Sequence, residues 1–167
     1  MAAMSRGRVI HRLLEILPSV ASEHWDSAAK AVIEETGAEH SVQAMLDIVK
    51  PILGNPNLVH LFDDKALSEV PFHAILRKRK FAGVIDVLVP GEQSILVVDF
   101  KSNAVIPTLP GDVPLGLLRQ MGAYAAAVGA IFPDKKIDTA ILWTGNGQLM
   151  PLSHGVVTEA FNLAPLP

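Results

Sequence analysis

Cysteine is absent from the sequence. This absence excludes disulfide scaffolds, zinc sites built on thiolates, iron–sulfur clusters and cysteine nucleophiles. Aromatic residues make up only 5% of the chain and charged residues 19%, whereas hydrophobic residues make up 50%. Disordered chains combine low hydrophobicity with high net charge, so this composition predicts a folded protein. A length of 167 residues is enough for one domain with a substantial hydrophobic core.

The sequence also lacks the patterns of membrane spans and secretion signals. The longest stretch without Asp, Glu, Lys or Arg, residues 139–158, contains Gly145, Asn146 and Pro151, which make a spanning helix untenable. The cationic N-terminus lacks the apolar region of a signal peptide. We therefore expect a cytoplasmic protein that does not enter a membrane.

A large excess of positive charge is missing as well. The formal net charge is −3, which by itself does not indicate a nucleic-acid-binding protein. The most concentrated positive charge is the run from Arg77 to Lys80. A run of this kind is either a solvated turn or a contact for phosphate groups, and its sequence does not distinguish the two.

Apolar periodicity divides the chain into a helical first part and a mixed second part. Three helices are predicted before residue 51, with Ser22 and Ser41 as candidate N-caps and Gly37 and Pro51 at helix ends. A short helical piece is predicted at 57–62. Segments rich in Val, Ile and Phe predict strands, and two more helices follow. The predicted strands are 66–76, 80–89, 93–101, 137–144 and 148–152, and the later helices are 115–131 and 155–162.

This order of elements predicts an α/β fold with one mixed sheet flanked by helices. We expect a single domain over residues 1–167, in which residues 1–65 form a helical segment and residues 66–167 form the α/β core. Trp25 and Trp143 are expected in the hydrophobic core.

Two aspartates and a lysine interrupt otherwise apolar strands on either side of the turn at Pro90-Gly91: Asp86, Asp99 and Lys101. Charged side chains rarely lie within apolar strands unless they are paired or bind a metal. Two carboxylates select hard cations such as Mg²⁺ or Mn²⁺, and a neighbouring lysine stabilises negative charge on a phosphoryl group. A buried Asp–Lys ion pair would explain the same residues without a metal.

Strand alternation indicates that these side chains can meet. If residues 90–93 form a four-residue loop, Val89 pairs with Ser94, and Asp86 lies opposite Val97. Asp86 is then diagonal to Asp99 and on the same face of the sheet as Asp99 and Lys101. An irregularity in either strand would break this relation.

These residues resemble a known family. Gly83-x-Ile85-Asp86 followed by Val98-Asp99-Phe100-Lys101 is similar to the core of the PD-(D/E)XK nuclease superfamily, and more narrowly to the C-terminal nuclease domain of AddA and RecB helicase–nucleases. Three further blocks support the narrower resemblance. They are Gln120-Met-Gly-Ala-Tyr124, similar to a Q-x-x-x-Y element; His11, at the position of a metal-binding histidine on an N-terminal helix; and Glu69, on the acidic strand before the hairpin.

The resemblance implies a restriction-endonuclease-like fold and a Mg²⁺-dependent DNA nuclease, with Mn²⁺ as an alternative metal. It implies exonuclease-like hydrolysis of phosphodiester bonds, leaving a 5′-phosphate, in double-strand-break repair and recombination. The expected substrate is single-stranded or frayed DNA, and the expected partner is a helicase or an AddB-like subunit. In this reading His11, Asp86, Asp99 and the carbonyl of Phe100 bind the metal, and Lys101 positions the attacking water. Gln120, Tyr124 and Glu69 complete the site.

The sequence departs from the family pattern in two ways. Val87 follows Asp86 where many relatives carry arginine, and no G-x-x-x-x-G-K-[ST] motif is present, so the helicase motor is missing. The chain is therefore either a stand-alone nuclease or part of a larger protein. The Arg77–Lys80 run and Arg119 are expected to hold the DNA backbone.

Other readings stay open at this point. A non-catalytic, nuclease-like module could bind DNA ends or a partner subunit, although intact Asp86, Asp99 and Lys101 argue against it. A junction resolvase or a restriction enzyme would share the fold. For His11, Glu69 and the Gln120/Tyr124 pair, ordinary surface or packing roles are the alternatives.

Overall fold

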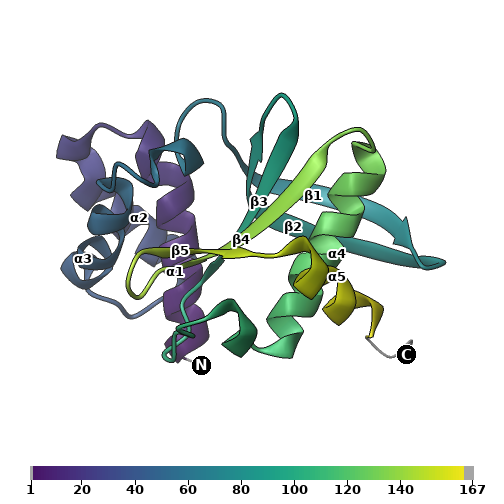
Figure 1. Ribbon diagram of the computed structural model, residues 1–167. Helices are drawn as coiled ribbons and strands as arrows, with labels where there is room; N and C mark the ends of the chain where they lie inside the picture. The colour runs from purple at the N-terminus through teal and green to yellow at the C-terminus, as the bar shows by residue number, and fades with distance from the viewer. Residues whose placement is uncertain (1, 164–167) are drawn as a thin grey trace.

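The computed structural model describes residues 2–163, with side chains described from residue 5 onward. The chain starts with three helices and continues as a mixed sheet with two further helices (Figure 1). The helices are α1 (Ala2–Ile16), α2 (Trp25–Thr36), α3 (Val42–Leu53), α4 (Leu115–Ile131) and α5 (His154–Asn162). The strands are β1 (Leu67–Leu76), β2 (Arg79–Pro90), β3 (Ser94–Lys101), β4 (Lys136–Trp143) and β5 (Gln148–Leu152).

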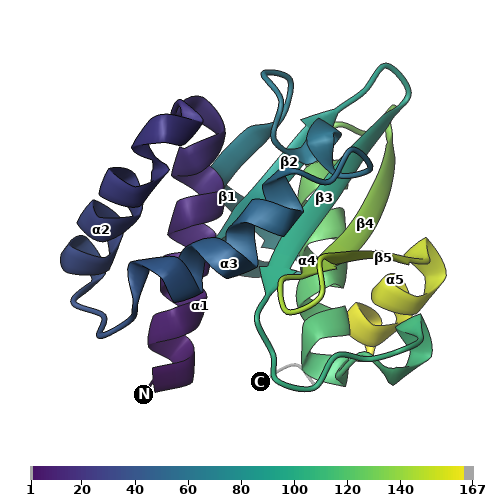
Figure 2. The same cartoon turned by 90° about the vertical axis from the view of Figure 1, so that its left-hand side faces the viewer.

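The five strands form one sheet in the order β1-β2-β3-β4-β5. All neighbours are antiparallel except β3 and β4, which are parallel and are connected through α4. Helices α1–α3 cover one face of this sheet, and α4 and α5 cover the other (Figures 1 and 2). The predicted α/β class, a mixed sheet flanked by helices, is confirmed. None of the helices in residues 2–163 is long and apolar enough to cross a membrane.

Two hydrophobic cores lie on the two faces of the sheet. The core under α1–α3 includes Val98 and Phe100 of β3, whereas the core under α4 and α5 includes Val97. Side chains of a strand alternate between faces, so the apolar β3 supplies both cores. Trp143 is fully buried as predicted, but Trp25 is only partly buried at the edge of the α1–α3 core.

Most predicted elements are confirmed, and the errors are local. The Ser41 side chain caps α3 by accepting the Ala44 N–H, and Gly37 ends α2 in the left-handed conformation with φ 62°. Ser22 is not an N-cap; it begins a short 3₁₀ turn, and α2 starts only at Trp25. Pro51 lies inside α3 instead of ending it.

The predicted register of the β2–β3 hairpin is wrong by two residues. Val89 pairs with Leu96 rather than with Ser94, because the turn comprises residues 91–94 and is closed by the Gly91 N–H donating to the Ser94 carbonyl. Pro90 belongs to the strand despite its pyrrolidine ring, and it pairs with Ile95. Since the shift is an even number of residues, it does not change which face each side chain would take on a regular strand.

Candidate functional site

The candidate site lies where strands β2 and β3 separate. Their ladder ends at the pair Val87↔Val98, and the next residues along the two strands are Asp86 and Asp99. Here a side chain replaces main-chain pairing, because Asp86 Oδ2 accepts a hydrogen bond from the Phe100 N–H at 2.6 Å. The Asp86 carboxylate is therefore held against the main chain of β3 directly after Asp99.

Strand β2 does not alternate regularly at Asp86. Ile85 packs in the α4–α5 core and Val87 in the α1–α3 core, although residues two apart on a regular strand face the same side. The β1–β2 ladder also skips the pair of Glu69 and Asp86, and Glu69 has a φ of 50°, in the left-handed region. The sequence argument that placed Asp86 beside Asp99 assumed a regular alternation that fails at this residue.

Asp99 and Lys101 form a buried ion pair on one face of β3. Lys101 Nζ lies 2.5 Å from Asp99 Oδ2, and Asp99 is only 3% exposed. Burial raises the pKa of Asp99 to about 6; the Lys101 charge opposes this shift and the Asp86 charge adds to it. Asp99 is thus a carboxylate whose ionised form the protein alone stabilises poorly.

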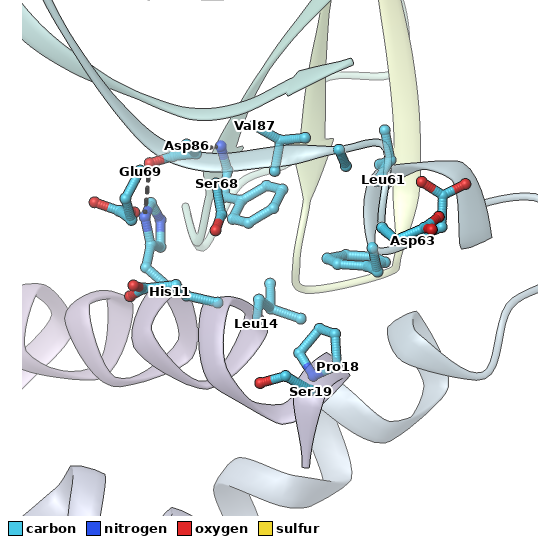
Figure 3. Close-up of a pocket in the computed structure, with 15 residues that line it drawn as sticks. His11, Leu14, Pro18, Ser19, Leu61, Asp63, Ser68, Glu69, Asp86 and Val87 are labelled. Atoms are coloured by element: carbon cyan, nitrogen blue, oxygen red, sulfur yellow. Dashed lines mark hydrogen bonds and ion pairs between the residues drawn. The ribbon is translucent and has the colours of Figure 1, made fainter. Parts of the chain in front are cut away.

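Helix α1 brings His11 to the same place. His11 Nδ1 lies 3.4 Å from Asp86 Oδ1, and the imidazole points from α1 toward the strands (Figure 3). Burial lowers the pKa of His11, but the hydrogen bond and the charge of Asp86 outweigh it, so that the net pKa is raised. The charges of Asp99 and Lys101 also act on His11. We call His11, Asp86, Asp99 and Lys101 the fork cluster.

Helix α1 passes close to the chain that follows β3. A Cβ atom added at Gly7, one turn before His11, would lie 2.7 Å from Ser102 Oγ. The contact would be with the tip of a serine side chain, which can rotate away, so the close approach itself is the finding.

Gln120 and Tyr124 act on β2 from the opposite face of the sheet. The Tyr124 hydroxyl donates to the Val84 carbonyl at 3.1 Å and accepts from Gln120 Nε2 at 2.8 Å. Burial, followed by the charge of Asp99, raises the pKa of Tyr124 to about 12, so the hydroxyl remains a donor at neutral pH. The pair therefore fixes β2 two residues before Asp86.

Glu69 lies beside the fork cluster on β1. Partial burial raises its pKa, and the charges of Asp86 and Glu15 raise it further. Glu69 lines both cavities that adjoin Asp86. Its carboxylate is therefore within the electrostatic reach of the cluster, and its role stays a prediction.

Two of the cations predicted to bind DNA, Arg77 and Arg119, differ in their hydrogen bonding. Arg77, at the tip of the β1–β2 hairpin, donates to the Phe161 carbonyl at 2.9 Å and lies over the Phe161 ring, so it fastens the hairpin to α5. The Nε of Arg119 is buried and has no hydrogen-bond partner in the part of the chain that the structure describes. Neither observation tests a contact with DNA.

Two arginines close to the fork cluster were not expected from the sequence. Arg8 and Arg12 line a groove of about 610 Å³ together with His11 and Asp86, and Arg12 also pairs with Glu15 at 2.6 Å. The spacing of three and four residues between Arg8, His11 and Arg12 places them on one side of α1 and could have indicated this.

The fork cluster fits a hard divalent cation, although no preformed group of three His, Asp or Glu side chains occurs within the described residues. Two carboxylates suit Mg²⁺ or Mn²⁺, whereas the imidazole is a ligand more typical of transition-metal ions. The 3.4 Å between His11 Nδ1 and Asp86 Oδ1 is close to the spacing of about 3 Å between neighbouring ligands of an octahedral ion. The buried Asp99 carboxylate has Lys101 as its cationic partner, and a metal ion would compensate its charge further.

Residues 1–150 match the family model of the PD-(D/E)XK nuclease superfamily, and the chain belongs to this superfamily. The mixed sheet with helices on both faces is its restriction-endonuclease-like fold. No curated protein matches the sequence significantly.

One solved structure agrees with this fold. A presumed exonuclease from Eubacterium rectale has a TM-score of 0.60 and 12% sequence identity, over 90% of this chain and 63% of its own. This chain thus spans less than two thirds of that protein. A second structure, of SSO0001, has a TM-score of 0.40 and 14% identity over 95% of this chain and 86% of its own. At 12% identity the first likeness concerns the fold alone, and the second TM-score is too low to carry an argument.

Proposed function

We propose that this chain is a Mg²⁺-dependent deoxyribonuclease, with Mn²⁺ as a substitute, that hydrolyses phosphodiester bonds of DNA in an exonuclease-like way. The observation that carries the proposal is the fork cluster in a chain of the nuclease superfamily. It brings together two carboxylates, an imidazole and an ammonium group from three different elements.

Asp86, Asp99, His11 and the Phe100 carbonyl would hold the metal ion. When bound, the ion lowers the pKa of a water molecule and stabilises negative charge on the phosphoryl group. The Lys101 ammonium orients the attacking water and stabilises the charge that develops on the phosphate oxygens. The Phe100 N–H keeps the Asp86 carboxylate in place, and Tyr124 fixes the strand that carries it. Glu69 and Gln120 complete the site.

We further propose a relation to the nuclease domains of AddA and RecB and a role in double-strand-break repair and recombination. The geometry of His11 beside Asp86, and of Gln120 and Tyr124 beside β2, supports this relation because both were expected from the resemblance. The proposal includes a single nuclease domain over residues 1–167, a cytoplasmic location, and a helicase or AddB-like partner. It also includes a preference for single-stranded or frayed DNA and cleavage that is indifferent to ATP.

A cleavage assay tests the proposal. The purified chain is incubated with labelled single-stranded and blunt duplex DNA, with Mg²⁺, Mn²⁺ or EDTA, and with or without ATP. We expect metal-dependent, distributive cleavage that favours single strands and ignores ATP. Asp99→Asn should abolish it. Asp138→Asn is the matched control, because Asp138 is also a strand aspartate paired with a lysine two residues away, at 2.7 Å from Lys136.

Several outcomes would count against the proposal. Cleavage by Asp99→Asn at the rate of the unaltered chain would refute the assignment of the site. DNA binding without cleavage in either metal would favour the non-catalytic module instead. Rapid processive digestion of blunt duplex, or stimulation by ATP, would contradict the proposed substrate preference.

A further inference from the structure

A second cavity adjoins the fork cluster and has no role in the proposal above. It has a volume of about 330 Å³ and is drawn in Figure 3. His11, Glu69 and Asp86 line one side of it, and Leu61 and Asp63 lie at the other side. Cavities from about 300 Å³ upward hold small organic ligands in proteins.

The floor and walls of this cavity are apolar and partly aromatic. Leu14 and Leu61 form part of the buried floor, and the half-buried Phe62 stands against Phe100 with the ring centroids 6.2 Å apart and the planes tilted by 38°. Phe62 comes from the segment between α3 and β1, and Pro18 from the short 3₁₀ turn that follows α1. Such surroundings suit a flat, apolar ring face.

The charges around the cavity select against phosphate. Its described lining contains no lysine or arginine but five carboxylates: Glu15, Asp63, Asp64, Glu69 and Asp86. The groove on the other side of His11 and Asp86 shares Glu15, Glu69 and Asp86 with the cavity but adds two cations, Arg8 and Arg12, of which Arg12 is paired with Glu15. A phosphodiester backbone is therefore repelled less by the groove than by the cavity.

We infer that this cavity holds an unpaired nucleobase of the DNA strand being cut, next to the scissile phosphate. A nucleobase is uncharged, has a flat ring for Phe62, and carries N–H donors for carboxylates and for the Ser68 hydroxyl, which also lines the cavity. The phosphates then run along the groove with Arg8 and Arg12. The inference rests on the proposed nuclease function and gives a physical reason for a single-strand preference, since a base in this cavity cannot be paired.

The first test measures binding without cleavage. Single-stranded oligonucleotides carrying 2-aminopurine at successive positions are added to the metal-free chain, and stacking is detected as quenching of the 2-aminopurine fluorescence. We expect quenching confined to one position. Phe62→Leu, which keeps an apolar side chain but removes the ring, should abolish that quenching. Phe132→Leu is the matched control, because Phe132 is 41% exposed and lies outside the lining of the cavity.

The second test uses the unaltered chain, so that it does not depend on the folding of a variant. An abasic residue is placed at successive positions of a single-stranded substrate, and kcat and KM are measured with Mg²⁺. At one position we expect KM to rise about tenfold, the effect of losing one stacked base, with a smaller change in kcat.

The outcomes separate this inference from the proposed function. Cleavage that is unaffected by an abasic residue at every position, together with equal quenching by the unaltered chain and Phe62→Leu, would overturn the nucleobase assignment but leave the nuclease intact. A chain that cleaves nothing in Mg²⁺ or Mn²⁺, yet quenches at one position through Phe62, would overturn the nuclease instead. Loss of the quenching in Phe132→Leu but not in Phe62→Leu would also refute the assignment.

Discussion

The helices on the two faces of the sheet, α1 and α4, contribute to the site in different ways. From the α1 face, His11 contacts the Asp86 carboxylate directly, and Arg8 lines the groove beside it. From the α4 face, Tyr124 bonds the main chain of β2 at Val84. Asp99 and Lys101 of β3 also lie on the α4 side of the sheet, because they alternate in step with Val97. Helix α1 thus supplies groups that can meet a ligand, whereas helix α4 fixes the strand that carries a ligand-binding residue. Substitutions in the two helices should therefore fail in different ways.

The largest effect is expected at Lys101, which belongs to neither helix and is paired with Asp99 on β3. Removing a group that stabilises transition-state charge lowers kcat by about 10²–10³-fold, and we expect this of Lys101→Gln with little change in KM for DNA. Single-turnover cleavage in saturating Mg²⁺ measures it. Lys136→Gln is the control, because Lys136 also pairs with an aspartate two residues away but lies on the surface. Equal rates for the two variants would remove Lys101 from the reaction.

On the α1 face, His11→Ala should weaken metal affinity about 10–100-fold while DNA binding changes little. The Mg²⁺ concentration for half-maximal cleavage measures the first quantity, and fluorescence anisotropy without metal measures the second. Because the pKa of His11 is raised, its protonated form persists closer to neutral pH and competes with the metal. Activity of the unaltered chain should therefore fall on acidification at limiting Mg²⁺ and recover at high Mg²⁺. A fall that excess metal does not relieve would contradict this.

The raised pKa of Asp99 predicts that the stability of the metal-free chain depends on pH. Its pKa in the folded state is about 6, above its ordinary value of 3.8, so the folded chain holds the proton more tightly than the unfolded chain. This stabilisation is complete below pH 3.8 and is lost as the pH rises through 6. Relative to that of Asp99→Asn, the free energy of unfolding of the unaltered chain should fall by on the order of 1–3 kcal/mol as the pH rises from below the ordinary pKa of Asp99 to above its folded-state pKa. Urea denaturation at several pH values measures the difference, and a constant difference would disprove it.

The smallest effect is expected in helix α4. Tyr124→Phe removes one hydrogen bond to β2 and should lower the free energy of unfolding by about 1 kcal/mol. It should also lower kcat modestly, without the change in metal affinity expected of His11→Ala. Thermal denaturation and Mg²⁺ titration of cleavage measure these effects. If Tyr124→Phe shifted the Mg²⁺ dependence as strongly as His11→Ala, the distinction between the two helices would be lost.

Much of this architecture follows from local sequence patterns. The α4 helix and β5 have the predicted bounds, and the Ser41 cap is where the pattern placed it. The apolar strands, their order and the two covered faces follow from composition and alternation, because most of the fold is built from regular elements.

What the sequence did not predict depends on irregular or distant contacts. Alternation fails at Asp86 because its carboxylate replaces a main-chain pairing partner and Glu69 opposite adopts a left-handed conformation. The cavity draws on α1, on the segment around Phe62 and on β2 and β3, which no local pattern brings together. Arg77 appeared as part of a charged run, whereas the fold ties it to Phe161.

The most direct test of the central claim is the position of a bound metal. In a crystal of this chain grown with Mn²⁺, anomalous diffraction should place one peak within coordination distance, about 2.2 Å, of carboxylate oxygens of both Asp86 and Asp99, with His11 adjoining it. The same peak should be missing from crystals of Asp99→Asn. A Mn²⁺ peak elsewhere, with Asp86 and Asp99 uncoordinated in a chain that cleaves DNA only with Mn²⁺, would contradict the account.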